Sequence, residues 1–191
     1  MRQYTGAIVQ SPETVKRYCT LQYNVFQTRK KIAVLALSVA LAVSGIIIAG
    51  NNKLLGLGLA FVGCLIFSNS NAAAEYTANR IIELFKGNYP TLHYSFSYSF
   101  LMLEDSNKTV EYNSLIRLVE DDEYLYLFEN PQYAVMVKKS LISGENGAEG
   151  LKKLLSEKTG LLWTRPLSVL NFKLSNLLPS RTDKWEGPRL R

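Results

Sequence analysis

The stretch IAVLALSVALAVSGIIIA, residues 32–49, decides the fold of this chain. It is an uncharged run of 18 residues without a polar face. As an α-helix it would span about 27 Å, because each residue adds about 1.5 Å along the helix axis. This length approaches the roughly 30 Å of hydrocarbon in a bilayer. The stretch therefore predicts a transmembrane helix.

A second apolar run follows after a link of four residues, Gly50 to Lys53. Leu54–Phe67 has 14 residues and reaches spanning length only if it includes the weakly polar residues 68–74. The short link requires the two helices to be antiparallel. Residues 32–74 are therefore predicted to form a transmembrane helical hairpin. The alternative is a buried helical hairpin in a soluble protein.

Basic residues lie at the outer ends of this hairpin. Three precede the first run, two follow the second and one lies in the link: Arg29, Lys30 and Lys31; Arg80 and Lys86; and Lys53. Cytoplasmic flanks of membrane helices are enriched in Lys and Arg, so both termini are expected to face the cytoplasm. The basic flank and the missing polar face argue against the soluble alternative.

Small residues recur at every fourth position in both runs. They are Ala36, Ala40 and Ser44 in the first run, and Gly56, Ala60, Cys64 and Ser68 in the second. Such stripes allow helix backbones to approach closely in lipid, which predicts that the two stripes form the contact. The alternative is that they reflect only the abundance of Ala and Gly in membrane helices.

Charge is distributed unevenly over the 191 residues, whose formal net charge is +6. Residues 1–31 carry six basic groups and one acid, and residues 161–191 carry six basic groups and two acids. Residues 92–160 carry seven basic groups and eleven acids. Basic flanks beside a membrane span favour anionic lipid as the partner. Binding of nucleic acid is not expected, because it requires a basic face on the folded domain.

The remaining sequence predicts helices before and after the hairpin and then a run of strands. A short strand at residues 4–10 is followed by a helix from Glu13 to Lys31 that leads into the membrane, with Pro12 at its start. A linker helix is expected at residues 75–86. Aromatic and polar residues alternate from Leu92 to Met102, which predicts one long strand. Further strands are expected at residues 109–112, 115–120, 124–128 and 133–138, and a helix at 147–159 that Gly160 ends.

This order of elements resembles the YcxB-like family of bacterial membrane proteins. The resemblance covers about residues 5–160, and the segments that carry it are YSFSYSF (94–100), VEYNSL (110–115), VE (119–120), YLYLF (124–128) and AVMVKK (134–139). It implies a cytoplasmic domain related to bacterial pleckstrin-homology-like (PH-like) modules, on a multi-pass protein of the bacterial inner membrane. The family carries no active-site residues that could be transferred to this chain.

The predicted fold class is therefore an α+β membrane protein. A two-helix transmembrane hairpin carries a small antiparallel PH-like β-domain that is closed by a C-terminal helix. The expected parts are an N-terminal strand and helix (1–31), the hairpin (32–74), a linker helix (75–90), the β-domain (91–160) and a basic amphipathic tail (161–191).

Residues with catalytic potential are sparse, and no catalytic, cofactor-binding or metal-binding residue is predicted. His93 is the only histidine, and a single histidine on the polar side of a strand favours a solvated side chain. The acids of residues 120–123 lack the spacing of a metal-binding loop and favour a solvated turn. Cys19 and Cys64 would be kept apart by the hairpin, so a disulfide is not expected. The aromatic face of Tyr94, Phe96, Tyr98 and Phe100 favours an inward core face over a ligand surface.

The tail contains a leucine stripe between Pro166 and Leu178, typical of an amphipathic helix on the cytoplasmic leaflet. Packing of that helix on the β-domain or on the linker helix is the alternative. The expected membrane-surface contacts of the whole chain are Arg29, Lys30, Lys31, Trp163, Arg165, Lys173 and Arg181.

The predicted function is a membrane-anchored binding or scaffolding module, without catalysis, whose partners are the bilayer and a protein, peptide or lipid ligand. The alternative is a membrane-bound sensor or regulator in which the hairpin transmits a signal to the domain. An enzyme would need a convergent polar pocket, which the sequence does not indicate.

Overall fold

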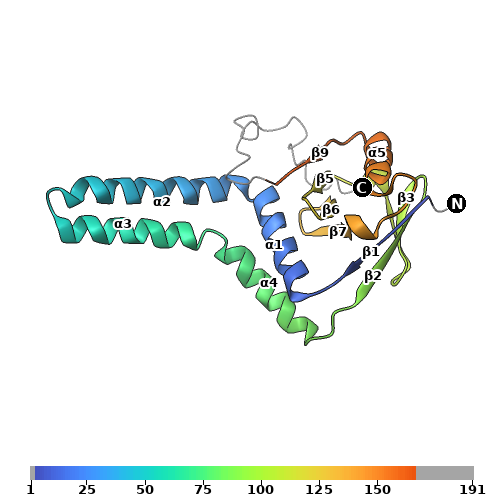
Figure 1. Ribbon diagram of the computed structural model, residues 1–191, viewed down its shortest axis with the longest axis horizontal. Helices are drawn as coiled ribbons and strands as arrows, with labels where there is room; N and C mark the ends of the chain where they lie inside the picture. The colour runs from blue at the N-terminus through green and yellow to red at the C-terminus, as the bar shows by residue number, and fades with distance from the viewer. Residues whose placement is uncertain (1–2, 167–191) are drawn as a thin grey trace, which may run out of the picture.

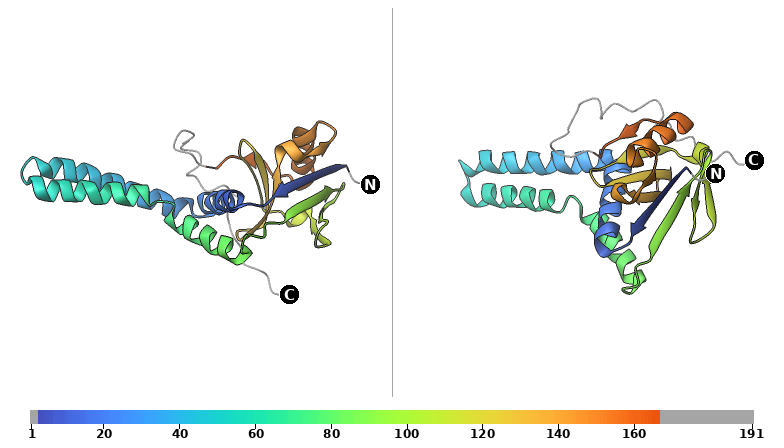
Figure 2. Two further views of the ribbon diagram at one scale, coloured as in Figure 1. Left: turned by 60° about the horizontal axis from the view of Figure 1, so that its bottom comes forward. Right: turned by 45° about the vertical axis from the view of Figure 1, so that its right-hand side comes forward.

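The computed structural model describes residues 3–166 of the chain and has a mixed α+β fold. Two long helices, α2 (Thr28–Ala49) and α3 (Lys53–Ser68), lie antiparallel and project from one end of a domain built on two sheets (Figures 1 and 2). By length and composition, α2 is the one described helix that could cross a membrane. Helices α3 and α4 (Ala72–Phe85) are long and apolar enough to cross a membrane only if they are taken together as one span. The two are bent by 43° at the break between them.

The first sheet has five strands in the order β4-β3-β2-β1-β8, all antiparallel. Their bounds are β1 Tyr4–Val9, β2 Thr91–Phe96, β3 Phe100–Leu103, β4 Lys108–Glu111 and β8 Ser143–Gly144. The expected N-terminal strand is thus confirmed, and it pairs with β2 along its whole length. Since β1 precedes the hairpin and β2 follows it, this sheet joins the two ends of the hairpin.

The second sheet has four strands in the order β7-β6-β5-β9, antiparallel except for the β5–β9 pair. Their bounds are β5 Arg117–Glu120, β6 Tyr124–Asn130, β7 Tyr133–Lys138 and β9 Trp163–Thr164. Helix α5 (Gly147–Thr159) follows β8, matches its predicted range and contributes the buried Leu151 and Leu155. Both sheets and α5 share one core, with Phe96, Leu101 and Tyr126 fully buried. The two sheets and α5 are called the β-domain below.

The prediction of one long strand from Leu92 to Met102 is wrong, because a tight turn at residues 97–99 divides this segment into β2 and β3. The Ser97 N–H donates to the Phe100 carbonyl at 2.9 Å and closes this turn. Tyr94 and Phe96 are buried as expected, but Tyr98 lies on the turn and is 62% exposed. After the turn, the alternation of inward-facing and outward-facing side chains is shifted by one residue. Leu101 therefore faces the core in place of Phe100.

Helix α1 (Pro12–Phe26) begins where the sequence predicts but does not continue into the membrane run. Ser11 caps it: the Thr14 N–H donates to Ser11 Oγ at 3.2 Å, and the Ser11 N–H donates to Thr14 Oγ1 at 2.8 Å. The helix is interrupted at Gln27, and α2 starts at Thr28. The prediction of a single helix over residues 13–31 is therefore wrong. The break frees α1 to turn away from α2 and pack against the β-domain (Figure 1).

Candidate membrane-anchoring site

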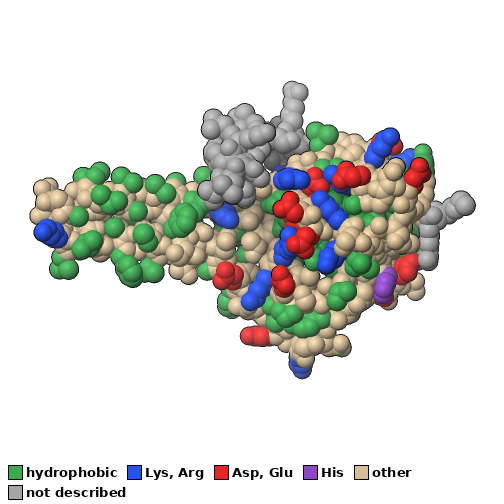
Figure 3. Space-filling model, in the orientation of Figure 1, with side chains coloured by type: hydrophobic (Ala, Val, Ile, Leu, Met, Phe, Trp, Pro, Cys, Tyr) green, Lys and Arg blue, Asp and Glu red, His purple; other side chains and the backbone are tan. Residues whose placement is uncertain are grey.

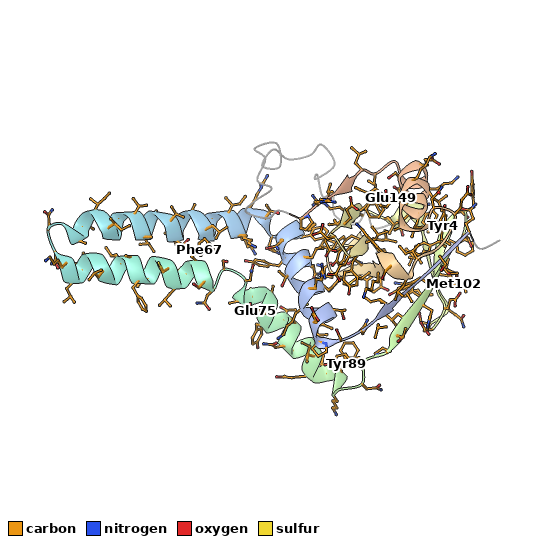
Figure 4. The ribbon with its side chains drawn as sticks, in the orientation of Figure 1. Tyr4, Phe67, Glu75, Tyr89, Met102 and Glu149 are labelled. Atoms are coloured by element: carbon orange, nitrogen blue, oxygen red, sulfur yellow. The ribbon has the colours of Figure 1, made fainter. Side chains whose placement is uncertain are left out.

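The surface of the α2–α3 hairpin is largely apolar. Twelve large apolar side chains on it are exposed: Leu37, Val39, Val43, Ile46 and Ile47 on α2, and Leu54, Leu55, Leu57, Phe61, Val62, Leu65 and Phe67 on α3. Figure 3 shows hydrophobic side chains spread along the visible face of the projecting hairpin, with a basic group at its tip. Figure 4 shows side chains pointing outward from both helices. Soluble proteins rarely expose a continuous apolar surface of this kind, which marks an interaction site.

The two helices contact each other through small residues, but at a different spacing from the predicted one. The buried positions are Ser38 and Gly45 on α2, and Gly56 and Gly63 on α3. A Cβ on Gly56 would collide with the backbone of Ala49, and one on Gly63 would lie 2.7 Å from the Ala42 nitrogen. These glycines therefore permit the close approach of the two backbones.

The predicted stripes of small residues are partly wrong. Gly56 and Ala60 do lie at the contact, Ala60 against Gly45. The other members are exposed: Ala36, Ala40, Ser44, Cys64 and Ser68. A four-residue step rotates by about 40° around a helix with 3.6 residues per turn, whereas a seven-residue step drifts by only about 20°. Over several turns, the contact therefore follows the seven-residue spacing.

Lys31 forms hydrogen bonds at the base of the hairpin, where α1, α2 and the α3–α4 link meet. Its Nζ donates to Asn24 Oδ1 of α1 at 2.6 Å and to Asn71 Oδ1 of the link at 3.0 Å. Arg29 and Lys30 are exposed on the first turn of α2. The base thus combines a half-buried cation, which holds three segments together, with two cations that face solvent.

The other predicted membrane-surface residues have different surroundings. The Trp163 side chain packs on the core of the β-domain, and its Nε1–H donates to the Lys152 carbonyl of α5 at 3.1 Å. Arg165 lies 3.8 Å from a Glu120 carboxylate oxygen and 3.8 Å from Asp122. Lys173, Arg181 and the predicted tail helix lie outside the described residues.

Helix α1 connects the hairpin base to the second sheet, an arrangement absent from the expectations based on the sequence. Arg17 Nε donates to Asp121 Oδ2 at 2.9 Å, and the Arg17 guanidinium lies over the Tyr124 ring at 4.8 Å. The Tyr18 hydroxyl accepts the Ala134 N–H of β7 at 3.0 Å, and burial raises the pKa of Tyr18 to about 12. The Phe26 ring meets Phe128 edge-on at 5.0 Å. A signal for this packing is present in the spacing of Tyr18, Leu21, Val25 and Phe26, which places all four on one helix face.

The acidic turn after β5 is confirmed as a turn, but two of its acids are not solvated. Glu120 is 12% exposed and contacts Lys139 Nζ at 2.9 Å and Lys152 Nζ at 3.1 Å. Burial opposes ionisation of Glu120, yet the hydrogen bonds from both lysines outweigh it and lower its pKa. Asp121 accepts hydrogen bonds from Arg17 and the Tyr126 hydroxyl, whereas Asp122 remains exposed. These contacts tie β5, α5 and α1 together.

The single histidine and two surface depressions are the remaining features of the described surface that bear on a site. His93 is exposed, and its Nδ1 lies 3.4 Å from Asp105 Oδ1. Within residues 3–166 no three His, Cys, Asp or Glu side chains come close enough to hold a metal ion. Two shallow depressions of about 350 and 450 Å³ lie beside Gly150 and beside Tyr98.

One segment of the chain is similar to a known protein family. Residues 101–155, from β3 into α5, match the family described as YcxB-like protein, which confirms the predicted resemblance over that segment. Neither the curated proteins nor the solved structures contain a match. The similarity to the YcxB-like family is therefore shown for residues 101–155, the segment from β3 into α5.

Proposed function

We propose that this protein is a membrane-anchored binding or scaffolding module in which α2 and α3 span the bilayer as a hairpin. The observation that carries the proposal is the large apolar surface exposed on both helices of that hairpin. Only 11% of the most apolar 18-residue window of α2 is buried inside the protein. Lipid would remove this surface from water, and dispersion contacts between the helix backbones would hold the hairpin together.

The lengths and charges of the hairpin support a spanning arrangement. Helix α2 has 22 residues and is about 33 Å long, which suits the hydrocarbon core of a bilayer. Helix α3 is about 24 Å long, and its end at Asn69–Asn71 brings polar groups to the headgroup level. The three cations at the base, against Lys53 alone at the tip, orient the base toward the cytoplasm. Both termini and the β-domain would then be cytoplasmic, in a multi-pass protein of the bacterial inner membrane.

The β-domain is the part that would bind a protein, a peptide or a lipid headgroup at the membrane surface. Its PH-like character, inferred from the family resemblance, supports this role. The charges of the domain also support this role. Glu120 and Asp121 are held in internal ion pairs, as expected of side chains that stabilise a scaffold and not of an acid–base site. The acidic excess of residues 92–160 disfavours nucleic acid as the ligand.

Membrane fractionation tests the anchor. The full chain, expressed in bacterial cells, should remain in the membrane pellet after alkaline carbonate and high salt, and detergent should release it. Val39→Asp places a charge on the lipid-facing middle of α2 and should move much of the protein to the carbonate supernatant or to inclusion bodies. Lys53→Gln, at the tip, is the matched control and should behave like the original chain. Release of the unchanged protein by carbonate would contradict the anchor.

A second candidate function is a sensor or regulator in which the hairpin transmits a signal to the β-domain. The contacts of α1 favour it, because α1 is joined to α2 through a single residue, Gln27, and is fixed to the second sheet by Arg17 and Tyr18. A displacement of the hairpin base would therefore move the edge of that sheet. A scaffold without signalling needs no such linkage.

A further inference from the structure

The β-domain presents a second surface beside the base of the hairpin. Strands β5 and β9 are parallel, with Leu118 beside Trp163. Arg117 and Leu162 each precede one of these paired residues, and Leu162 lies just before β9 begins. Successive side chains of a strand point to opposite faces, and Trp163 faces α5. Arg117 therefore lies on the opposite face of the sheet, and the exposed Leu162 adjoins it in the chain segment just before β9.

That face meets the junction between α1 and α2. The Arg117 guanidinium lies 5.9 Å from the centre of the Phe26 ring, and its Nη1 donates to the Val25 carbonyl at 3.4 Å. Helix α2 begins two residues after Phe26 and bears the exposed Arg29 and Lys30. In all three ribbon views the end of β9 lies next to the start of α2 (Figures 1 and 2).

The chemistry of this surface is basic with an apolar protrusion. None of Arg29, Lys30 and Arg117 has an acid within ion-pair distance among residues 3–166, whereas Arg17, Lys139 and Lys152 are all paired. Leu162 is 82% exposed, the second most exposed of the large apolar side chains described. Cations without an acidic partner, together with an exposed leucine, suit a membrane interface, where anionic headgroups attract the cations and the acyl boundary receives the leucine.

We propose that the surface formed by Arg29, Lys30, Arg117 and Leu162 docks on anionic lipid headgroups, so that the β-domain lies against the bilayer and does not hang free from its anchor. This inference rests on the proposed membrane anchor. It is favoured by the position of the surface, which continues the lipid-facing surface of the hairpin. Docking would fix the orientation of the β-domain and leave the β2–β3 turn facing away from the membrane.

Site-directed quenching tests the docking in the full chain. In a Cys19→Ala, Cys64→Ala background, a bimane label is placed at Leu162→Cys or, as a control, at Tyr98→Cys on the β2–β3 turn. The protein is reconstituted into vesicles of phosphatidylcholine alone or mixed with phosphatidylglycerol, each containing a lipid with a nitroxide on its headgroup. Quenching should be strong at position 162 in the anionic vesicles, weaker in phosphatidylcholine alone, and low at position 98 in both.

Substitution of Arg117 tests the role of charge without disturbing insertion of the hairpin. Arg117→Gln should lower the ratio of docked to undocked domain roughly fivefold, since each cation near an anionic surface contributes about that factor. Arg117→Lys should retain docking, and added salt should weaken it. Equal quenching at positions 162 and 98 in a chain that resists carbonate would overturn the docking and leave the anchor intact. A chain that carbonate releases would overturn both.

Discussion

Residues 91–191 expressed alone are expected to remain unfolded, although they contain β2 to β9 and α5. The fragment lacks β1, which pairs with β2 over six residues and with β8 at Tyr4 and Thr5. It also lacks Ile8, which is 3% exposed in the core, and the α1 side chains that cover the second sheet. Without β1, β2 becomes an open edge and β8 has no partner. Circular dichroism should show no cooperative thermal unfolding for this fragment.

A chain without the hairpin provides the matched control. Asn24 and Asn71 both accept a hydrogen bond from Lys31 Nζ, so the end of α1 and the start of α4 lie close together. A flexible linker of about eight Gly and Ser residues, with a mean span of about 15 Å, can join residues 3–26 to residues 72–191. This chain should be soluble and melt cooperatively. A folded 91–191 fragment with the same melting temperature would show that β1 is dispensable.

Glu120→Ala should lower the free energy of unfolding of that soluble chain by about 3 kcal/mol. The substitution leaves Lys139 and Lys152 half-buried without their shared carboxylate, and breaking a buried ion pair from one side typically costs about 3–5 kcal/mol. The lower end applies because Glu120 is still 12% exposed. Glu149→Ala is the control: its carboxylate also contacts Lys152 but is 75% exposed, so its loss should cost at most about 0.5 kcal/mol. Urea unfolding measures both.

The same network predicts how stability depends on pH. The folded-state pKa of Glu120 lies below its ordinary value of 4.5. The carboxylate therefore stabilises the fold above about pH 4.5, and this contribution is lost as the pH falls through the lowered pKa. Between pH 6 and pH 3, the unchanged chain should lose more stability than Glu120→Ala does. Identical pH profiles for the two chains would refute the ion-pair account of this site.

The features that follow from local chemistry could be predicted from the sequence. Helix α5 matches its predicted range, because Gly160 adopts φ 68° and ends it. The start of α1 follows from Pro12, because the first residue of a helix needs no N–H for a hydrogen bond within the helix. The helix after the apolar runs and the acidic turn at residues 120–123 also have strong local signals.

The features that depend on distant contacts could not be predicted. The pairing of β1 with β2 bridges the whole hairpin, and periodicity within either strand says nothing about its partner. The turn at residues 97–99 is formed by serines and a tyrosine that fit a strand equally well. For the candidate site, the base of the hairpin could be located from its charges, but the engagement of Lys31 and the burial of Trp163 depend on tertiary packing.

Two-sided cysteine labelling tests the central claim, the membrane-spanning hairpin, most directly. In the Cys19→Ala, Cys64→Ala background, single cysteines are placed at the exposed Asn51 in the hairpin tip and at the exposed Ser106 in the β-domain. In right-side-out membrane vesicles, a membrane-impermeant maleimide should label Asn51→Cys at once and Ser106→Cys only after the vesicles are lysed. Labelling of both residues only after lysis, or of both before it, would contradict the spanning hairpin.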